Sequence, residues 1–145
     1  MTMYRHILVP TDGSRFSARA IRMAADLAQA FGAKLTGLYV VAPYFPAHSG
    51  QGYASMSGFR RAVEKEAKHA LAAFSAGARA RGVAATTVAM VGGEPWQAVL
   101  RAARAKKCDL IVMASHGRRG LAGLILCCET TKVLTHSKVP VLVCR

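Results

Sequence analysis

Short apolar runs alternate along this chain with longer stretches in which apolar residues recur every three or four positions. The short runs predict strands at 4–10, 35–41, 83–91, 110–114 and 139–144. The longer stretches predict amphipathic helices at 15–31, about 58–81, 95–107 and about 127–136. The segment 42–57 is rich in proline and glycine and predicts a loop.

Residues with capping chemistry stand at the ends of these helical stretches. Ser14 can accept a hydrogen bond from a free backbone N–H at the start of the first helix, and Gly32 can end that helix. Pro95 suits the first turn of the third helix, and Gly82 ends the second. Within the first helix, the spacing predicts that Met23 faces inward with its apolar neighbours.

The alternation of strands and helices predicts an α/β protein. Nearly continuous apolar strands are typical of parallel sheets that are covered on both faces. Right-handed crossovers then favour an open, doubly wound, five-stranded parallel sheet of order 3-2-1-4-5 with helices on both faces. We expect one domain spanning 1–145, because the helix after the 42–57 loop is needed to cover the sheet.

Composition adds a strong positive charge. Twenty Lys and Arg residues against seven Asp and Glu residues give a formal net charge of +13. Such a balance favours polyanions, so a nucleic-acid-associated protein is one hypothesis, although the cations are spread over several helices and no nucleic-acid motif is present. No apolar run reaches the roughly 20 residues of a membrane span. Without an apparent signal peptide, we expect a cytoplasmic protein with no membrane partner.

Polar clusters follow the first and fourth strands, which are neighbours in the expected order. Ligands of doubly wound sheets bind beyond the carboxyl ends of the strands, where the strand order reverses. The sequence therefore predicts one crevice, and its expected lining residues are Pro10, Thr11, Asp12, Met113, Ala114, His116 and Gly117.

Two residues in this crevice have more than one interpretation. Asp12 can bind a ribose hydroxyl or a metal ion held by phosphates, or it can bond within its own Asp-Gly turn. His116 can act as a base or donate to a phosphate, but bonding to nearby backbone is the favoured interpretation. No legible nucleophile and carboxylate partner accompanies His116.

The loop after the fourth strand has the features of a phosphate cradle. Gly117 and Gly120 allow close backbone approach to a ligand, and Arg118 adds positive charge. The start of the following helix would offer unpaired N–H groups to an anion. No P-loop motif occurs in the chain.

Three segments together resemble the universal stress protein family. They are Ile7-Leu-Val-Pro-Thr-Asp-Gly-Ser14, Asp109-Leu-Ile-Val-Met-Ala-Ser-His-Gly117 and Val139-Pro-Val-Leu-Val-Cys144. The resemblance covers essentially the whole chain in the right order. It implies a small cytosolic stress-response protein, commonly a homodimer, and some members of the family bind ATP or AMP.

Members that bind nucleotide carry a motif of Gly, two residues, Gly, nine residues, then Gly and Ser or Thr. Here the motif falls on Ala114, Gly117 and the pair Cys127-Cys128, so the spacing is kept while three of four residues differ. By resemblance, Asp12 would lie near the ribose or a Mg²⁺ ion, and Val40 or its neighbour would meet the base through backbone.

The cysteine pair makes the phosphate cradle weaker than that of a motif-complete member. A side chain at Cys127 hinders the close approach that glycine allows, and a thiol at Cys128 donates more weakly than a hydroxyl. The backbone N–H groups of residues 127 to 130, which include Glu129 and Thr130, do not depend on the side chains and would remain available to a phosphate. Thr130 can add a hydroxyl. We therefore expect weaker binding, with AMP the ligand that depends least on the cradle.

A thiol at a helix N-terminus can also be reactive, so redox sensing or metal binding by Cys127 and Cys128 is an alternative. Adjacent Cα atoms lie about 3.8 Å apart, short of the usual disulfide separation, and no third or fourth metal ligand has a legible spacing. Two small residues packed beneath a loop are the favoured interpretation.

The last predicted strand, which runs from Val139 to Cys144, lies at an edge of the expected sheet and is rich in apolar residues. An apolar edge favours pairing with a second copy, as the resemblance also implies. The leading hypothesis is a stress-response homodimer regulated by ATP or AMP. The alternatives are a dimer that binds no nucleotide and acts through protein partners, a nucleic-acid-associated protein, and a slow Mg²⁺-dependent ATP hydrolase that uses Asp12.

Overall fold

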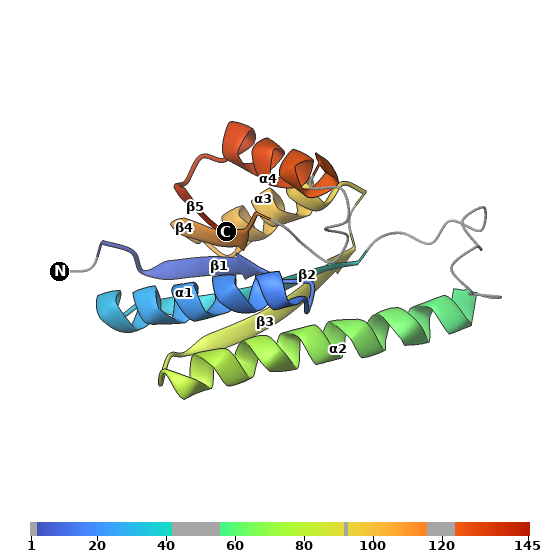
Figure 1. The fold of residues 1–145 in the computed structure, drawn as a ribbon, viewed down its shortest axis with the longest axis horizontal. Helices are drawn as coiled ribbons and strands as arrows, with labels where there is room; N and C mark the ends of the chain where they lie inside the picture. Colours follow the sequence, from blue (N-terminus) through green and yellow to red (C-terminus); the bar gives the residue numbers. More distant parts are fainter. Residues whose placement is uncertain (1–2, 42–55, 92, 116–123) are drawn as a thin grey trace.

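The chain folds as a parallel sheet between two layers of helices. The computed structural model describes residues 3–41, 56–91, 93–115 and 124–145, the last segment from residue 129 onward in its side chains. The strands are β1 (His6–Pro10), β2 (Lys34–Val41), β3 (Ala85–Val91), β4 (Leu110–Ala114) and β5 (Val141–Cys144). The helices are α1 (Arg15–Phe31), α2 (Met56–Ala80), α3 (Pro95–Ala105) and α4 (Leu124–His136). Figure 1 shows the elements in order along the chain.

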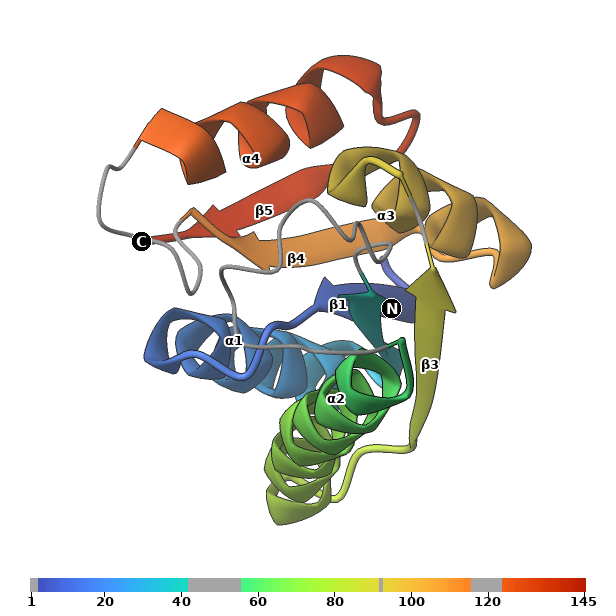
Figure 2. The same ribbon diagram turned by 90° about the vertical axis from the view of Figure 1, so that its right-hand side faces the viewer.

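The strand order is β3-β2-β1-β4-β5, and every pair is parallel, so the predicted topology is confirmed. Figure 2 shows α1 and α2 on one face of the sheet and α3 and α4 on the other. Successive side chains of β1 pack alternately in the cores on the two faces of the sheet. Ile7 and Val9 lie in the core under α1 and α2, whereas Leu8 lies in the core under α3 and α4.

The predicted caps of α1 are confirmed. Ser14 accepts a hydrogen bond from the backbone N–H of Ser17 at 3.2 Å, and Gly32 adopts the left-handed conformation with φ of 68°. The inward placement of Met23 is wrong, because 44% of its surface is exposed. Ile21 occupies the buried position instead, and the apolar stripe of α1 runs through Ala20, Ile21, Ala24 and Ala28.

The start of α4 also differs from the expectation. The helix begins at Leu124 rather than at Cys127, so the cysteine pair lies inside the helix and not at its first residues. No glycine or proline stands between Gly123 and Pro140, and leucine is a good helix former, so the sequence permits the earlier start.

Three polar side chains, one each from β1, β2 and β3, form a row of hydrogen bonds near the amino end of the sheet. The Nε2 atom of His6 lies 2.7 Å from Oγ1 of Thr36, which in turn lies 3.0 Å from Oγ1 of Thr86. Burial lowers the pKa of His6, the positive charge of Lys34 lowers it further, and Asp109 partly opposes both. The folded protein therefore favours neutral His6.

Stability is expected to fall as His6 is forced to accept a proton. The unfolded chain takes up this proton near pH 6.5, above the pKa of the folded state, so the free energy of unfolding decreases as pH falls through about 6.5. Urea midpoints of the wild type and His6→Gln, measured at about pH 7.5 and about pH 5.5, test this. A wild-type midpoint that falls no more than that of His6→Gln would contradict the assignment.

Candidate functional site

The strand order reverses between β1 and β4, and the chain places polar residues at that point. In register, Ile7 lies opposite Leu110 and Leu8 opposite Ile111. The carboxyl ends of both strands therefore meet at one edge of the sheet. The predicted site residues Pro10, Thr11 and Asp12 reach this edge from β1, while Met113 and Ala114 reach it from β4.

Asp12 is held by the start of α1. Its Oδ1 atom accepts hydrogen bonds from the backbone N–H of Ser14 at 2.9 Å and from the hydroxyl of Ser17 at 2.6 Å. The backbone N–H of Asp12 donates to the same Ser17 oxygen at 3.1 Å. The turn bonding that the sequence allows is thus present. These two bonds orient the carboxylate of Asp12 at the start of α1.

Thr11 and Gly13 fix the path of the turn that carries Asp12. Thr11 is buried, and its backbone N–H donates to the carbonyl of Leu38 at 2.8 Å. Gly13 has φ of 81°, and a Cβ added there would lie 3.3 Å from the Cβ of Ala70 in α2. Both the left-handed conformation and the close approach of α2 favour glycine at this position.

The end of β4 is tied to its neighbours on two sides. The hydroxyl of Thr130 in α4 donates to the carbonyl of Ala114 at 3.3 Å. The backbone N–H of Ser115 donates to the carbonyl of Cys144 at 2.8 Å. Thr130 is buried, and the bond from its hydroxyl joins α4 to the end of β4.

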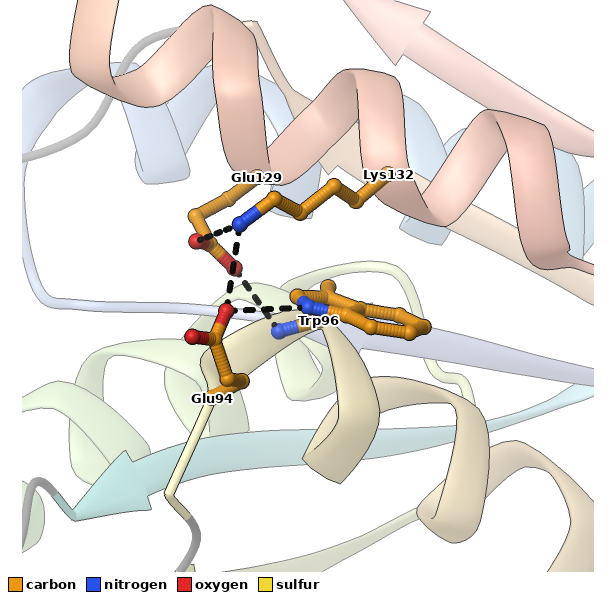
Figure 3. Close-up of polar contacts among 4 residues, drawn as sticks. All are labelled: Glu94, Trp96, Glu129 and Lys132. Carbon is orange, nitrogen blue, oxygen red and sulfur yellow. Dashed lines mark hydrogen bonds and ion pairs between the residues drawn. The ribbon is translucent and has the colours of Figure 1, made fainter.

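Glu129 is directed toward the start of α3. Its Oε2 atom accepts a hydrogen bond from the backbone N–H of Trp96 at 2.9 Å (Figure 3). Lys132 lies 3.6 Å from Glu129 Oε1 and donates to Oε2 of Glu94 at 3.1 Å. The indole N–H of Trp96 donates to the same Glu94 oxygen at 3.0 Å. These contacts join α4 to the start of α3, and Lys132 holds the pKa of Glu94 below its ordinary value.

The side chains of the predicted site residues Val40 and Met113 belong to the core on the α3 and α4 face. Met113 is buried in the core on the α3 and α4 face, and Val40 packs against that core. Other predicted site residues, His116, Gly117, Arg118 and Gly120, lie outside the described residues. The side chains of Cys127 and Cys128 lie outside them too, although both residues belong to α4.

Sequence reasoning missed Ser17, which is buried and bonds both to Asp12 and to Ser14. Its position three residues after the cap Ser14 was the available signal, because that spacing is where side chains reach back to a helix start. The role of Glu129 at a second helix could not be read from the sequence, since it depends on how α3 and α4 pack.

The described cysteines have the properties of structural residues. Burial raises the pKa of the Cys108 thiol to about 11 and also raises that of Cys144. A high pKa disfavours the reactive thiolate. Among the described residues no group of His, Cys, Asp or Glu side chains is suited to hold a metal ion. Nor does any helix in the described part of the chain have the length and apolar character to cross a membrane.

The fold and the position of the polar residues define a class: an open α/β protein whose candidate ligand site is the crevice at the point where the strand order reverses. The model of the universal stress protein family matches residues 3–145. The chain belongs to this family.

Individual relatives agree with that assignment. A universal stress protein of Methanocaldococcus jannaschii is 32% identical over 147 residues, which cover 99% of this chain and 83% of the relative. One from Thermus aquaticus is 31% identical over 143 residues and covers 99% of this chain and all of the relative. The crystal structure of a universal stress protein in complex with cAMP has a TM-score of 0.73 and 28% identity, with 98% of this chain and 97% of that one covered.

Proposed function

We propose that the protein is a stress-response protein regulated by an adenine nucleotide, ATP or AMP, bound in the crevice between the ends of β1 and β4. The observation that carries the proposal is the oriented carboxylate of Asp12 at the reversal of strand order. The cAMP complex of a similar family member supports the choice of an adenine nucleotide.

Each part of the nucleotide has a candidate partner in this chain. Asp12 would accept a hydrogen bond from the ribose or help to hold a Mg²⁺ ion that accompanies ATP. Backbone groups at Val40 would meet the base. The N-terminal end of α4 would face the phosphates, because its free N–H groups and positive dipole end favour an anion.

The start of α4 at Leu124 changes which backbone groups we assign to the phosphates. The N–H groups without an intrahelical partner are those of the first turn. With the start at Leu124, these groups precede Cys127, so the N–H groups of residues 127–130 are mostly used within the helix. Because the thiols of Cys127 and Cys128 replace a Gly-Ser pair, the site lacks a serine hydroxyl as a phosphate donor. This favours a ligand with fewer phosphates, and we propose AMP as the tighter of the two ligands.

Asparagine at position 12 separates the two roles proposed for Asp12. Asp12→Asn keeps an oxygen that can accept from Ser14 and Ser17 but removes the charge. If Asp12 holds the ribose, AMP binding is expected to weaken about tenfold without Mg²⁺. If Asp12 holds the metal, only binding of ATP with Mg²⁺ is expected to weaken. Isothermal titration calorimetry with each ligand measures both.

The matched control is Asp26→Asn, which removes the same charge from the other end of α1, where Asp26 pairs with Arg81 at 2.7 Å. It is expected to leave both affinities unchanged. Unchanged binding of both nucleotides to Asp12→Asn, or equal losses in the two variants, would contradict a site at Asp12.

We also propose a homodimer that pairs through the β5 edge, residues 139–144. Among the described strands β5 pairs with β4 alone, so its outer side is an edge of the sheet. Leu142 on this strand is 38% exposed and Leu134 on the neighbouring α4 is 50% exposed. Exposed apolar residues beside a strand edge are typical of a surface that pairs with another chain.

A further inference from the structure

A second concave surface lies at the end of the sheet opposite the crevice. It is a groove of about 230 Å³ between the C-terminal ends of α3 and α4 and the segment that leads into β5. Its apolar lining comes from Leu100, Ala103, Cys108 and Val139. Ala103 and Cys108 are buried, and Leu100 and Val139 are partly buried in the core of this face.

The rim of the groove is cationic. Arg104, Lys107 and Lys138 line it and are exposed, and none of the seven Asp and Glu residues of the chain does so. In the described part of the structure, the side chains of these three residues form no ion pair. They differ in this from Arg81 and Lys132, whose charges are paired with carboxylates.

The backbone at Lys107 supports a role for its charge. Lys107 has φ of 54°, and apart from glycines it is the one described residue with a positive φ. It follows the C-cap of α3, where glycine is the residue that adopts this conformation without strain. A lysine there therefore places a charge at the groove at some conformational cost.

Neutralisation of the helix ends accounts for only part of this charge. The C-terminus of a helix carries about half a negative elementary charge, so α3 and α4 together offset about one of the three cations. A redox role is also disfavoured, because burial raises the pKa of the Cys108 thiol to about 11. The groove thus retains an apolar floor beneath an excess of positive charge.

The size of the groove indicates what can occupy it. Small-molecule sites usually measure about 300–1,000 Å³, and this groove is smaller. An anchor residue of a protein interface needs room for only one apolar side chain. The groove lining contains no Phe, Tyr or Trp side chain, and one face of the His136 ring is stacked on Trp96, which disfavours single-stranded nucleic acid.

We propose that this groove binds an acidic segment of a partner protein that inserts one apolar side chain between Arg104, Lys107 and Lys138. The apolar side chain covers the floor, and flanking carboxylates meet the cationic rim. This surface is separate from the proposed nucleotide site and does not depend on it.

The fluorescence of Trp96 can report whether this groove is occupied. His136 lines it and stacks on Trp96, the one tryptophan of the chain, with ring centroids 4.7 Å apart and an interplanar angle of 26°. Occupation of the groove is expected to alter the stacking and therefore the tryptophan fluorescence.

The test uses the full chain and a synthetic peptide in which one leucine is flanked on each side by Asp and Glu. We expect saturable binding by fluorescence and calorimetry at low salt. We also expect a loss of about tenfold or more when the leucine is replaced by serine, and a similar loss for Arg104→Gln/Lys138→Gln. The matched control, Arg60→Gln/Arg61→Gln on exposed positions of α2, removes the same charge elsewhere and is expected to bind as the wild type does.

Four results would overturn the proposal. The first is no binding of the leucine peptide. The second is equal binding of the leucine and serine peptides, which would show charge attraction alone. The third is equal weakening in the two pairs of variants. A duplex DNA probe that binds more tightly than the peptide and is lost in Arg104→Gln/Lys138→Gln would also overturn it, because the rim would then serve a phosphate backbone.

Discussion

Replacing Gly37 with alanine is expected to lower the free energy of unfolding by about 2–3 kcal/mol. Gly37 lies in the middle of β2, where a Cβ would come within 2.5–2.7 Å of three ring carbons of Phe74. Phe74 is fully buried on the face of α2 that packs on the sheet, together with Ala67, Ala70 and Ala78, so its ring cannot move into solvent. The strand or the helix must shift to admit the added methyl group.

A double-mutant cycle identifies the cause of this loss. Phe74→Leu replaces the ring with a smaller aliphatic side chain, and the double variant Gly37→Ala/Phe74→Leu is expected to lose less stability than the two single changes added together. Gly93→Ala is the matched control, because a Cβ there meets nothing within 4 Å. Urea unfolding at one protein concentration measures all four variants. Strict additivity in the cycle would show that the Phe74 ring is not what excludes a side chain at Gly37.

Restoring the family motif with Cys127→Gly/Cys128→Ser is expected to tighten AMP and ATP binding about tenfold. Glycine permits closer approach of the backbone to the phosphates, and a serine hydroxyl donates more strongly than a thiol. Because α4 begins at Leu124, the new glycine would lie within the helix and is expected to cost about 1 kcal/mol of stability. The repair should therefore raise affinity and lower stability together.

Cys127→Ala/Cys128→Ala is the matched control for this repair. It removes both thiols but supplies neither the glycine nor the hydroxyl, so it is expected to gain little affinity. If both pairs of variants bind nucleotide as the wild type does, the cysteines are not what weakens the cradle. If the alanine pair matches the Gly-Ser pair, the thiols obstruct the site and the hydroxyl is unimportant.

The fold could be predicted from local signals that point to one structure. Ser14 and Gly32 mark the ends of α1, and the apolar strands separated by helical stretches are typical of a parallel sheet covered on both faces. The errors arose where a local signal was weak. Met23 is compatible with either face of α1, and the start of α4 has no capping residue between Gly123 and Cys127 that would fix it.

The juxtaposition of the carboxyl ends of β1 and β4 could be predicted because strand order alone places them together. The hydrogen bonds that the candidate site residues form could not be predicted. Glu129 reaches the start of α3, and Thr130 reaches β4, through the packing of α4 on its neighbours, which no sequence spacing specifies. The cationic groove was also missed, since Arg104 and Lys138 are far apart in the sequence and meet only where α3 and α4 end.

The two proposed surfaces lie at opposite ends of the sheet. The carboxyl ends of β1 and β4 carry the crevice with Asp12, and the groove with Arg104 and Lys138 lies where β4 and β5 begin. Because Glu129 and Lys132 join α4 to the start of α3, both helices that border the groove are also connected to the crevice end.

Backbone amide NMR during a titration with AMP tests the central claim most directly, since it reports whether the nucleotide binds and where. Saturable shifts are expected at Thr11, Asp12, Gly13 and Ser115, with little change at Lys107 and Lys138. No saturable shifts, or shifts confined to the cationic groove, would contradict a nucleotide site between β1 and β4.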